Sequence, residues 1–345
     1  MARVLCVGEA LVDRLGPPGG DPAEAPPNQL DDRLGGAPAN VACALARLGT
    51  SASFIGRLGR DGIGAAFAEL FSARGVDTSA LQWDGQRPSR IVLVRRDPSG
   101  ERSFGGFAGD LGQGFADQAL DAAALKPCID RLLTSADQAN AETPGAPPAD
   151  SSTWLLTGTI PLASSASAEA LELLVRRALS AGARLAVDVN WRPTFWNQGL
   201  APNAPPPAPV KERLRPLLER ADLLKCAAEE AEWLFGSTDP VAISVGLPSR
   251  PDVLITDGAN PVRWCVAGEC GERAAFAVPV VDTTGAGDAF TAGLLHCLCA
   301  HPDWPLGRRM AFAAACGALV CSGAGAIDPQ PTECDVLAFM ASQGA

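Results

Sequence analysis

Short hydrophobic runs alternate along the chain with longer segments in which apolar residues recur at helical spacing. The short runs predict strands, and they cover residues 4–13, 52–59, 154–158, 184–190, 221–226 and 253–258. The longer segments predict helices, and they cover residues 38–49, 63–75, 167–182 and 228–236. Strands that alternate with helices of roughly 10 to 15 residues are typical of βαβ units. The pattern therefore predicts an α/β fold in which helices cover both faces of a mainly parallel central sheet.

Residues 90–109 interrupt this alternation. Two extended stretches flank the turn signal Asp97-Pro98-Ser99-Gly100, and no helix separates them. We expect a hairpin here that, together with residues 14–34, forms a small antiparallel flap beside the main sheet. Proline-rich segments predict surface loops, because proline fits neither helix interiors nor central strands, and they cover residues 16–28, 143–150 and 201–210.

The composition is that of a globular protein. Its 345 residues are 47% hydrophobic and 19% charged, and the length exceeds the roughly 250 to 300 residues over which one core usually grows. Two domains, or one large domain with an appendage, are therefore expected. The chain opens without the pattern of a signal peptide, and no run reaches the roughly 18 apolar residues of a membrane helix, so we expect a soluble, cytoplasmic protein. The eleven cysteines include no CxxC pair, and we expect them to remain thiols.

The formal net charge of −11 argues against a nucleic-acid partner, because affinity for DNA or RNA comes mainly from lysine and arginine. The chain has three lysines, Lys126, Lys211 and Lys225, and none stands in the pattern GxxxxGKS/T. This excludes a Walker-A phosphate loop, and it leaves no VAIK-like lysine of the protein-kinase type.

Three other kinds of site find weak support. The segment from Gly285 to Phe290 approaches the dinucleotide-binding pattern GxGxxG, but phenylalanine replaces the third glycine and the segment lies far from the first strand. The segment HCLCAH, residues 296–301, suggests a metal, yet on one helix at best pairs such as His296 and Cys299 share a face, which falls short of a closed zinc site. Core packing explains this segment better. No GxSxG elbow of a Ser-His-Asp hydrolase accompanies either histidine.

The stretch VDTTGAGDAF, residues 281–290, predicts an anion site at the start of a helix. Glycines at such a turn free backbone amides to bind a phosphate, and the helix N-terminus adds about half a positive charge. Aspartate is a poor phosphate ligand, so Asp288 indicates chemistry. A set of polar residues and glycines lies mostly at the ends of other predicted strands or at the starts of the next helices, where open α/β sheets bind ligands. Its members are Asp13, Gly35, Gly36, Asn40, Asp188, Asn190 and Glu230. Together they predict a polar cleft.

These motifs resemble those of the PfkB, or ribokinase-like, family of small-molecule kinases. VDTTGAGDAF resembles its C-terminal signature, and GGAPANVACALARLG followed by IGRLGRDGIG resembles its N-terminal glycine signature. The similarity runs from VGEALVD near the start to GALVCSGAGA near the end. Within the family, GEALVD, SGERSF, DVNWRPTFW and ADLLKCAAEEAEWLFG are most similar to fructokinases.

The resemblance implies one ribokinase-like domain over residues 1–345, with a β lid formed by segments near 14–34 and 87–110. It implies ATP-dependent phosphorylation of a sugar hydroxyl, with D-fructose converted to fructose 6-phosphate. Ribose, 2-keto-3-deoxygluconate or a nucleoside are alternative substrates, and a non-catalytic partner protein is a more distant alternative. The expected partners are a small-molecule sugar and ATP, with no nucleic acid and no membrane. A homodimer formed through the lid is an assembly that the resemblance allows.

The resemblance also assigns roles to residues. Asp288 matches the general base, and Gly285, Ala286 and Gly287 match the anion hole that holds the transferring phosphoryl group. The positions that match sugar-binding residues are Asp13, Gly35, Gly36 and Asn40. Arg192 is expected to contact sugar or phosphate, or else to brace its loop against Asp188.

The cofactor positions match less completely. Thr256 and Gly258, with Gly285 and Gly287, match residues beside ATP, but Pro261 departs from the family's glycine pattern. Glu230 matches the glutamate of the NxxE motif that helps to hold the water shell of Mg²⁺, although Ala227 replaces the asparagine. The alternative is an exposed helix-surface glutamate. Asp282 and Thr284 match residues that bind a monovalent cation, usually K⁺, as an activator.

Overall fold

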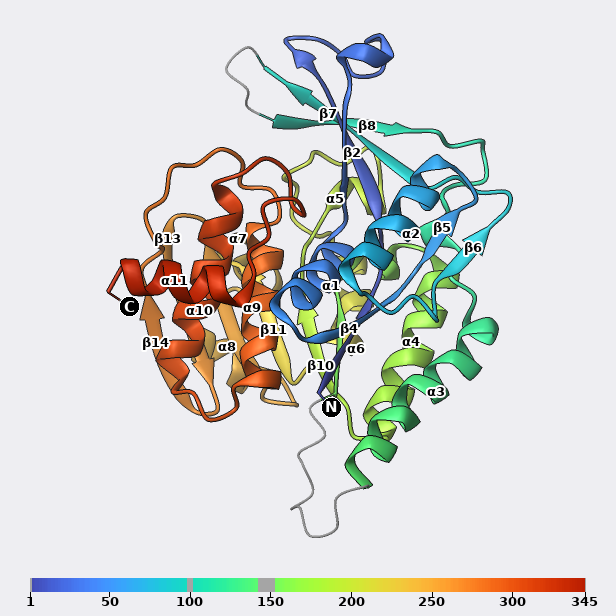
Figure 1. Cartoon of the computed structure of the whole chain (residues 1–345). Helices are drawn as coiled ribbons and strands as arrows, with labels where there is room; N and C mark the ends of the chain where they lie inside the picture. The colour runs from blue at the N-terminus through green and yellow to red at the C-terminus, as the bar shows by residue number, and fades with distance from the viewer. Residues whose placement is uncertain (1, 98–101, 142–152, 345) are drawn as a thin grey trace.

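The computed structural model describes residues 2–97, 102–141 and 153–344 (Figure 1). Within those ranges the strands are β1 (Arg3–Val7), β2 (Leu11–Pro18), β3 (Asp31–Gly35), β4 (Ser51–Ile55), β5 (Arg57–Gly59), β6 (Gln82–Asp84), β7 (Arg90–Arg96), β8 (Arg102–Ala108), β9 (Thr153–Thr157), β10 (Arg184–Asp188), β11 (Leu223–Ala227), β12 (Asp252–Asp257), β13 (Asn260–Val266) and β14 (Glu269–Arg273). The helices are α1 (Ala37–Leu48), α2 (Gly62–Arg74), α3 (Ala122–Ala141), α4 (Ser165–Ser180), α5 (Pro193–Trp196), α6 (Ala208–Leu218), α7 (Ala228–Phe235), α8 (Pro240–Gly246), α9 (Ala286–Ala300), α10 (Leu306–Cys321) and α11 (Glu333–Ser342), and the short 3-10 turns are η1 (Pro27–Gln29), η2 (Ala116–Gln118) and η3 (Ile160–Ala163).

The main sheet is mostly parallel, as the alternating pattern predicts. Among the described residues its strand order is β14-β13-β12-β11-β10-β9-β1-β4. The pairs from β12 through β11, β10, β9 and β1 to β4 are parallel, whereas the pairs β12–β13 and β13–β14 at one edge are antiparallel. Because the carboxyl ends of the parallel strands meet at one edge of the sheet, loops from distant parts of the sequence converge there.

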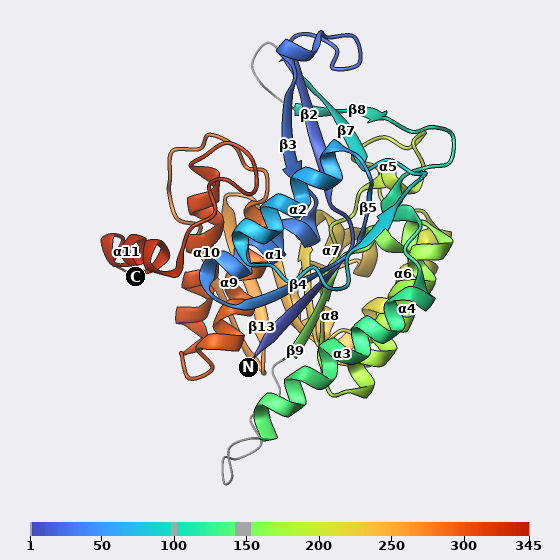
Figure 2. The ribbon, with the colours of Figure 1, turned by 45° about the vertical axis from the view of Figure 1, so that its right-hand side comes forward.

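Helices bury both faces of this sheet (Figures 1 and 2). Alternate residues of β1 illustrate the division: Val4 and Cys6 pack with residues of α1, α2, α9 and α10, whereas Leu5 and Val7 pack with residues of α3, α4, α6, α7 and α8. The strands are therefore apolar at consecutive positions, which explains why they read as continuous hydrophobic runs in the sequence.

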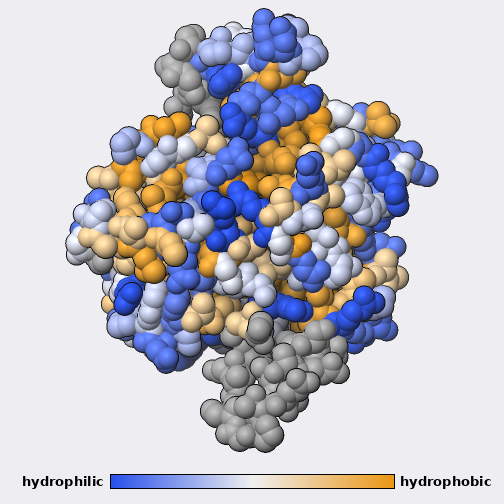
Figure 3. Space-filling model, viewed as in Figure 1, coloured by the Kyte–Doolittle hydropathy of each residue, from blue (hydrophilic) through white to orange (hydrophobic). Residues whose placement is uncertain are grey.

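A second, smaller sheet projects beyond the main one in the order β3-β2-β7-β8 (Figure 2). The expected hairpin is present as the antiparallel pair β7 and β8, and its turn at residues 98–101 lies outside the described residues. The expectation of an antiparallel flap is wrong in one respect, because β2 pairs with β7 in parallel. On the face seen in Figure 3 the projecting end is hydrophilic, and apolar side chains gather beneath it.

The opening hydrophobic run, residues 4–13, is two strands rather than the single strand expected. It breaks at Gly8, whose φ is +149° and where an added Cβ would lie 2.6 Å from Cγ of Pro38. The chain thus passes from β1 in the main sheet to β2 in the second sheet, which carries Asp13. The run at 52–59 divides in the same way into β4 and β5. Hydrophobic patterning cannot detect such breaks, because both halves of each run are apolar.

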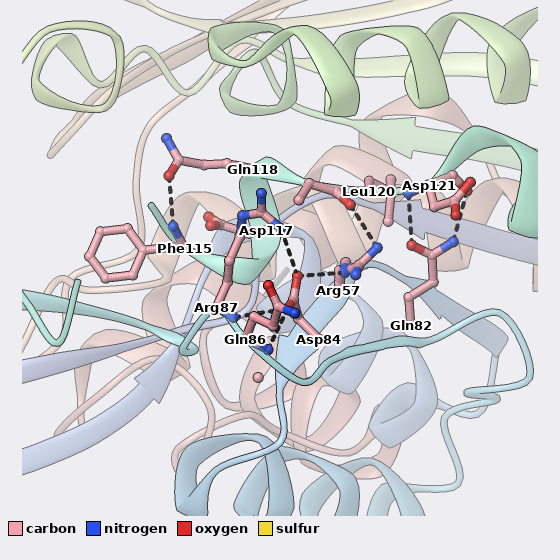
Figure 4. A network of polar contacts seen from close by, with 12 residues as sticks. Arg57, Gln82, Asp84, Gln86, Arg87, Phe115, Asp117, Gln118, Leu120 and Asp121 are labelled. Carbon is pink, nitrogen blue, oxygen red and sulfur yellow. Dashed lines mark hydrogen bonds and ion pairs between the residues drawn. The ribbon is translucent and has the colours of Figure 1, made fainter. Parts of the chain in front are cut away.

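A polar network fixes the segment that leads into β7 (Figure 4). The buried carboxylate of Asp84 pairs with Nε of Arg57 at 3.0 Å and with Nη1 of Arg87 at 3.4 Å. Burial alone would raise the pKa of Asp84, but the amides of Arg87 and Gln86 and the charge of Arg57 outweigh it and lower that pKa. Arg57 also donates to the carbonyl of Ala119 at 2.9 Å, so the network ties β5 and β6 to the turn η2. These contacts therefore connect the segment before β7 to β5 and to the residue that follows η2.

The cysteines and the lengths of the helices bear on two of the sequence-based expectations. All eleven cysteines are free thiols, some buried and some exposed. No helix within the described ranges is both long enough and apolar enough to span a membrane.

Candidate active site

A cavity of about 570 Å³ lies between the second sheet and the carboxyl ends of the central strands. Its walls come from β2, β7 and β8, from the segments that follow β1 and β10, and from the starts of α1 and α9. The polar and charged side chains that line it are those of Glu9, Asp13, Asn40, Ser103, Asn190, Arg192, Thr194, Lys225, Thr283, Thr284 and Asp288. The cavity matches only part of the cleft that the sequence predicts at this edge of the sheet. Asp13, Gly36, Asn40 and Asn190 line it, whereas Gly35, Asp188 and Glu230 do not.

The start of α9 forms one wall of the cavity. Gly285 is the N-cap residue of this helix and has a φ of +78°, and an added Cβ would lie 2.5 Å from Cβ of Ala326. Only glycine fits this left-handed, closely packed position. The amide of Ala286 donates to the carbonyl of Thr283 at 3.2 Å, and the first amides of any helix lack carbonyl partners within it. A helix start of this kind can bind an anion, although the amide of Ala286 is partly engaged here.

Asp288 is the third residue of α9, and its carboxylate points across the cavity wall toward α1. Its Oδ2 accepts a hydrogen bond from Nδ2 of Asn40 at 2.7 Å. Burial raises the pKa of Asp288 to about 6, and the charge of Asp188 adds to this effect, while Asn40, Lys225 and Arg192 act in the opposite direction. A carboxylate with such a pKa is ionised at neutral pH and can still accept a proton, which is the requirement for a general base.

Three of the four positions that match sugar-binding residues line the same cavity as Asp288. Asp13 and Asn40 line the cavity with their side chains, and Gly36 lines it with backbone. Gly36 has a φ of +102°, and an added Cβ would lie 2.7 Å from the carbonyl oxygen of Glu9, so a larger residue would displace the β1–β2 segment. Gly35 lies behind the lining, where an added Cβ would lie 3.3 Å from Oδ2 of Asp13. Among these positions, Asn40 contacts Asp288 directly through its hydrogen bond.

Lys225 is a charged residue of the site that the sequence analysis missed. It is the middle residue of β11, and its Nζ is 3.1 and 3.0 Å from the two carboxylate oxygens of Asp188. A Cβ added to Gly287 would lie 2.9 Å from this Nζ, so the ammonium group sits against the first turn of α9. Burial lowers the pKa of Lys225, but the charges of Asp188, Glu230 and Asp288 outweigh burial and raise it. The lysine is therefore a positive charge beside the start of α9.

Glu9 is a second residue whose place in the site the sequence did not reveal. It is 2% exposed, lines the cavity, and accepts a hydrogen bond on Oε1 from the amide of Ala37 at 3.2 Å. Its Oε2 is buried and has no hydrogen-bond partner among the described residues. Burial raises the pKa of Glu9 to about 8. Below that pH the carboxyl is protonated and can donate a hydrogen bond, which is a property suited to a ligand hydroxyl.

Comparisons with known proteins show the family of the chain. A family model described as pfkB family carbohydrate kinase matches residues 1–333. The chain belongs to the pfkB family. The resemblance drawn from the two glycine signatures is confirmed, and the chain is an ATP-dependent carbohydrate kinase.

Individual relatives agree with this assignment. A fructokinase from Vibrio alginolyticus is 30% identical over 349 residues, which cover 99% of this chain and 99% of that protein. The solved structure of a fructokinase with bound ATP from Xylella fastidiosa is 28% identical, covers 99% of both chains and has a TM-score of 0.77. A fructokinase double mutant from Vibrio cholerae O395, in its fructose-, ADP- and potassium-ion-bound form, is 26% identical, covers 98% of both chains and has a TM-score of 0.75.

In this pfkB kinase Glu230 is buried, not exposed, so the alternative of a helix-surface glutamate is wrong. It is 7% exposed, and its two oxygens accept hydrogen bonds from the amides of Trp191 at 2.6 Å and Ala227 at 2.8 Å. The loop after β10 is thereby joined to the start of α7. Desolvation raises the pKa of Glu230, against the opposing charge of Lys225.

Arg192 lines the cavity, and its Nη1 donates to the carbonyl of Trp191 at 3.0 Å. The expected brace between Arg192 and Asp188 does not match the contacts of Asp188, which accepts from Lys225 and from Oγ1 of Thr291 at 3.0 Å. The kinase therefore holds Asp188 through β11 and α9, and it leaves Arg192 facing the cavity.

The remaining predicted positions are Asp282 and Thr284, which match a cation site, and Thr256 and Gly258, which match residues beside ATP. Asp282 is 6% exposed; its Oδ1 accepts from the hydroxyl of Thr284 at 2.7 Å, and its Oδ2 accepts from the amide of Gly325 at 2.8 Å. Thr256 ends the parallel part of the sheet beside Ala227, and Gly258 follows in a turn with a φ of +56°. Neither Thr256 nor Gly258 lines the cavity.

Proposed function

We propose that this kinase transfers the γ-phosphoryl group of ATP to D-fructose and produces fructose 6-phosphate and ADP. The observation that supports it most is the position of the Asp288 carboxylate, which lies inside a sugar-sized cavity, on the first turn of a helix and close to Lys225. Similarity to fructokinases over nearly the full chain supports fructose as the sugar.

The proposed reaction follows from the charges of the site. Ionised Asp288 accepts the proton of the attacking hydroxyl, whose oxygen forms a bond to the γ-phosphorus. The bond between that phosphorus and the bridging oxygen breaks, and ADP leaves with its electron pair. Phosphoryl transfer depends mostly on positioning and on stabilisation of the charge on the phosphoryl oxygens. The amides near Gly285 and Gly287 and the ammonium of Lys225 are placed to supply this stabilisation.

The sugar would bind between the two sheets. Asp13 offers a carboxylate and Glu9 a buried carboxyl, and both suit hydroxyl groups. Val92, Val94 and Phe104 line the same cavity from β7 and β8. We propose that the segments near 14–34 and 87–110 act as a lid, whose apolar side chains exclude the water that would compete for the phosphoryl group.

Two cations are part of the proposal. Mg²⁺ neutralises charge on the phosphates of ATP, and Glu230 is the proposed contact to the water shell of this ion. Each carboxylate oxygen of Glu230 accepts a hydrogen bond from one backbone amide and can accept a further one from a water molecule. The oxygen donors of Asp282 and Thr284 suit K⁺, and a related fructokinase is known with a potassium ion bound. A cation there would orient the dipoles of the adjacent turn.

The choice of sugar predicts a selectivity. D-fructose should be phosphorylated with a kcat/KM at least about tenfold above that for ribose or glucose, a difference of roughly 1.4 kcal/mol in transition-state binding. ADP release measured across a panel of sugars and nucleosides checks this. Equal or faster turnover of ribose, 2-keto-3-deoxygluconate or adenosine would replace fructose with that substrate, and no turnover of any would favour the non-catalytic alternative.

The cation site predicts a salt effect. Activity should be higher in potassium than in sodium or a bulky organic cation at equal ionic strength, because only a bound ion of suitable size would order the turn at residues 282–284. Initial rates in the three salts measure the effect. Identical rates would remove the cation from the mechanism while leaving Asp288 in place.

The pKa of Asp288 predicts the acid limb of the pH profile. The base works only when ionised and its pKa is raised to about 6, so kcat/KM should fall about tenfold per pH unit below pH 6 and level off above it. Because the charge of Arg192 lowers this pKa, Arg192→Gln should move the midpoint upward. A midpoint near 4, or one that Arg192→Gln leaves in place, would show that another group governs the limb.

A further inference from the structure

A cluster of two imidazoles and one carboxylate lies at the far end of α9 from Asp288. It contains both histidines of the chain, His296 within α9 and His301 just beyond its end, together with Glu333 at the start of α11. One atom from each side chain, a ring nitrogen or a carboxylate oxygen, can be chosen so that all three lie within 4.8 Å of one another. The sequence of α9 alone offers too few ligands for a metal, but Glu333 supplies a further ligand from a second helix.

The carboxylate of Glu333 lies between the two rings. Its Oε1 is 2.7 Å from Nε2 of His301, and its Oε2 is 3.7 Å from Nε2 of His296. Ligand atoms about 2.0 Å from a tetrahedral metal are separated by roughly 3.3 Å, and the observed separations fall on either side of that value. Small side-chain rotations would therefore bring all three groups to bonding distance of one ion.

His296 carries an unpaired nitrogen into this cluster. The residue is 1% exposed, and its Nδ1 is 2.7 Å from Oγ1 of Thr50. Its Nε2 is buried without a hydrogen-bond partner among the described residues, which is a costly arrangement for a polar atom. In the tautomer whose Nδ1–H donates a hydrogen bond to Oγ1 of Thr50, Nε2 carries a lone pair on the side of Glu333. Such an outer hydrogen bond is how proteins fix the tautomer of a metal-binding histidine.

The exposure and the ring stacking of the cluster suit a ligand role. The side chains of His301 and Glu333 are 25% and 32% exposed, which leaves a path for an ion and room for a water ligand. The ring of His301 stacks on Trp304 at 3.8 Å between centroids, and this stacking holds its orientation.

We propose that His296, His301 and Glu333 form a binding site for a divalent transition metal of the zinc type, with water as the fourth ligand. Two histidines and one glutamate with an open position form a recognised tetrahedral zinc set, and imidazole with carboxylate suits borderline metals rather than Mg²⁺. The bound ion would join the end of α9 to the start of α11. It would lie about 12 Å along α9 from Asp288, so it would act on the stability of the helix that carries the base rather than on phosphoryl transfer.

The test uses metal-free full-length protein titrated with Co²⁺ alone under reducing conditions. The expected result is one Co²⁺ per chain, with the visible absorption of a tetrahedral nitrogen and oxygen site and no thiolate charge-transfer band. Glu333→Gln should weaken binding by at least about tenfold, because a neutral amide replaces an anionic ligand. Glu69→Gln, at an exposed glutamate of α2, is the matched control and should bind as the wild type does. Zn²⁺ should displace Co²⁺ and raise the Tm of the wild type but not that of Glu333→Gln.

The cysteines provide the main competing site, since Sγ of Cys265 and Sγ of Cys270 lie 3.0 Å apart on β13 and β14. The double variant Cys265→Ser with Cys270→Ser should retain full Co²⁺ affinity. The proposal is wrong if the wild type shows no saturable binding, if Glu333→Gln binds as tightly as the wild type, or if a thiolate band appears and disappears with the two cysteines. Glu333→Gln keeps a hydrogen-bonding amide beside His301, so the comparison holds even where a histidine variant fails to fold.

Discussion

Replacement of Lys225 by methionine is expected to lower kcat by about 10²- to 10³-fold, the loss typical when one group that stabilises transition-state charge is removed. The ammonium sits against Gly287, where the transferring phosphoryl group would approach the helix, and methionine keeps a similar length without the charge. Sugar affinity should change much less, because Lys225 acts on the phosphoryl group. Steady-state kinetics with separately measured fructose binding distinguish the two effects.

Lys225→Met also leaves Asp188 without its ion-pair partner. Asp188 is 4% exposed, and breaking a buried pair typically costs about 3 to 5 kcal/mol of stability. The double variant Lys225→Met with Asp188→Asn removes both charges and should recover much of the lost stability while kcat stays low. Lys126→Met, in α3, is the matched control and should leave kcat unchanged. If kcat recovers together with stability in the double variant, Lys225 serves only to neutralise Asp188.

Much of the fold could be predicted from the sequence because the central strands are buried on both faces. Continuous apolar runs such as residues 184–190 and 253–258 are what a helix-covered parallel sheet requires. Where two strands of different sheets follow each other directly, a continuous apolar run wrongly predicts a single strand. The break at Gly8 depends on its contact with Pro38, a residue distant in the sequence, and only the assembled fold reveals it.

The candidate site could likewise be predicted only in part from the sequence. Asp288 and the glycines before it could be identified because a helix-start turn and a carboxylate stand together in ten residues. Lys225 could not, because its role depends on contact with Gly287 and Asp188, which other elements supply. A lysine within the apolar run ADLLKC was the available signal, since a buried charge needs a partner. The sequence does not indicate that Glu333 lies near the two histidines, because helix periodicity cannot predict contacts between helices.

Replacement of Asp288 by asparagine should separate stability from activity. The pKa of Asp288 is raised from its ordinary value to about 6, so the folded protein favours the protonated carboxyl. Ionisation of Asp288 therefore lowers the free energy of unfolding. This loss grows as the pH rises from about 4 to 6 and is constant above pH 6. Asparagine removes this cost, which at about 1.4 kcal/mol per pKa unit amounts to roughly 3 kcal/mol. Asp288→Asn should therefore be at least as stable as the wild type at pH 7.5, with the larger difference above pH 6. Unfolding in urea at pH 5 and pH 7.5 measures this.

The same variant should lose most of its activity. Asparagine can still accept the hydrogen bond from Asn40 and leaves the amides of the α9 N-terminus in place, but it cannot take the proton of the sugar hydroxyl. General bases typically contribute about 10²- to 10⁴-fold, so kcat should fall by that factor while fructose and ATP affinities change little. If Asp288 served only as a helix cap, asparagine would replace it well and activity would persist. The structure gives the N-cap position to Gly285 and not to Asp288.

The most direct test of the proposed mechanism is the kcat of Asp288→Asn with D-fructose and ATP, measured on protein whose folding and fructose binding have been verified. The account predicts a kcat at least about 10²-fold below that of the wild type. A folded variant that binds fructose and retains more than about a tenth of the wild-type kcat would contradict the assignment of Asp288 as the general base.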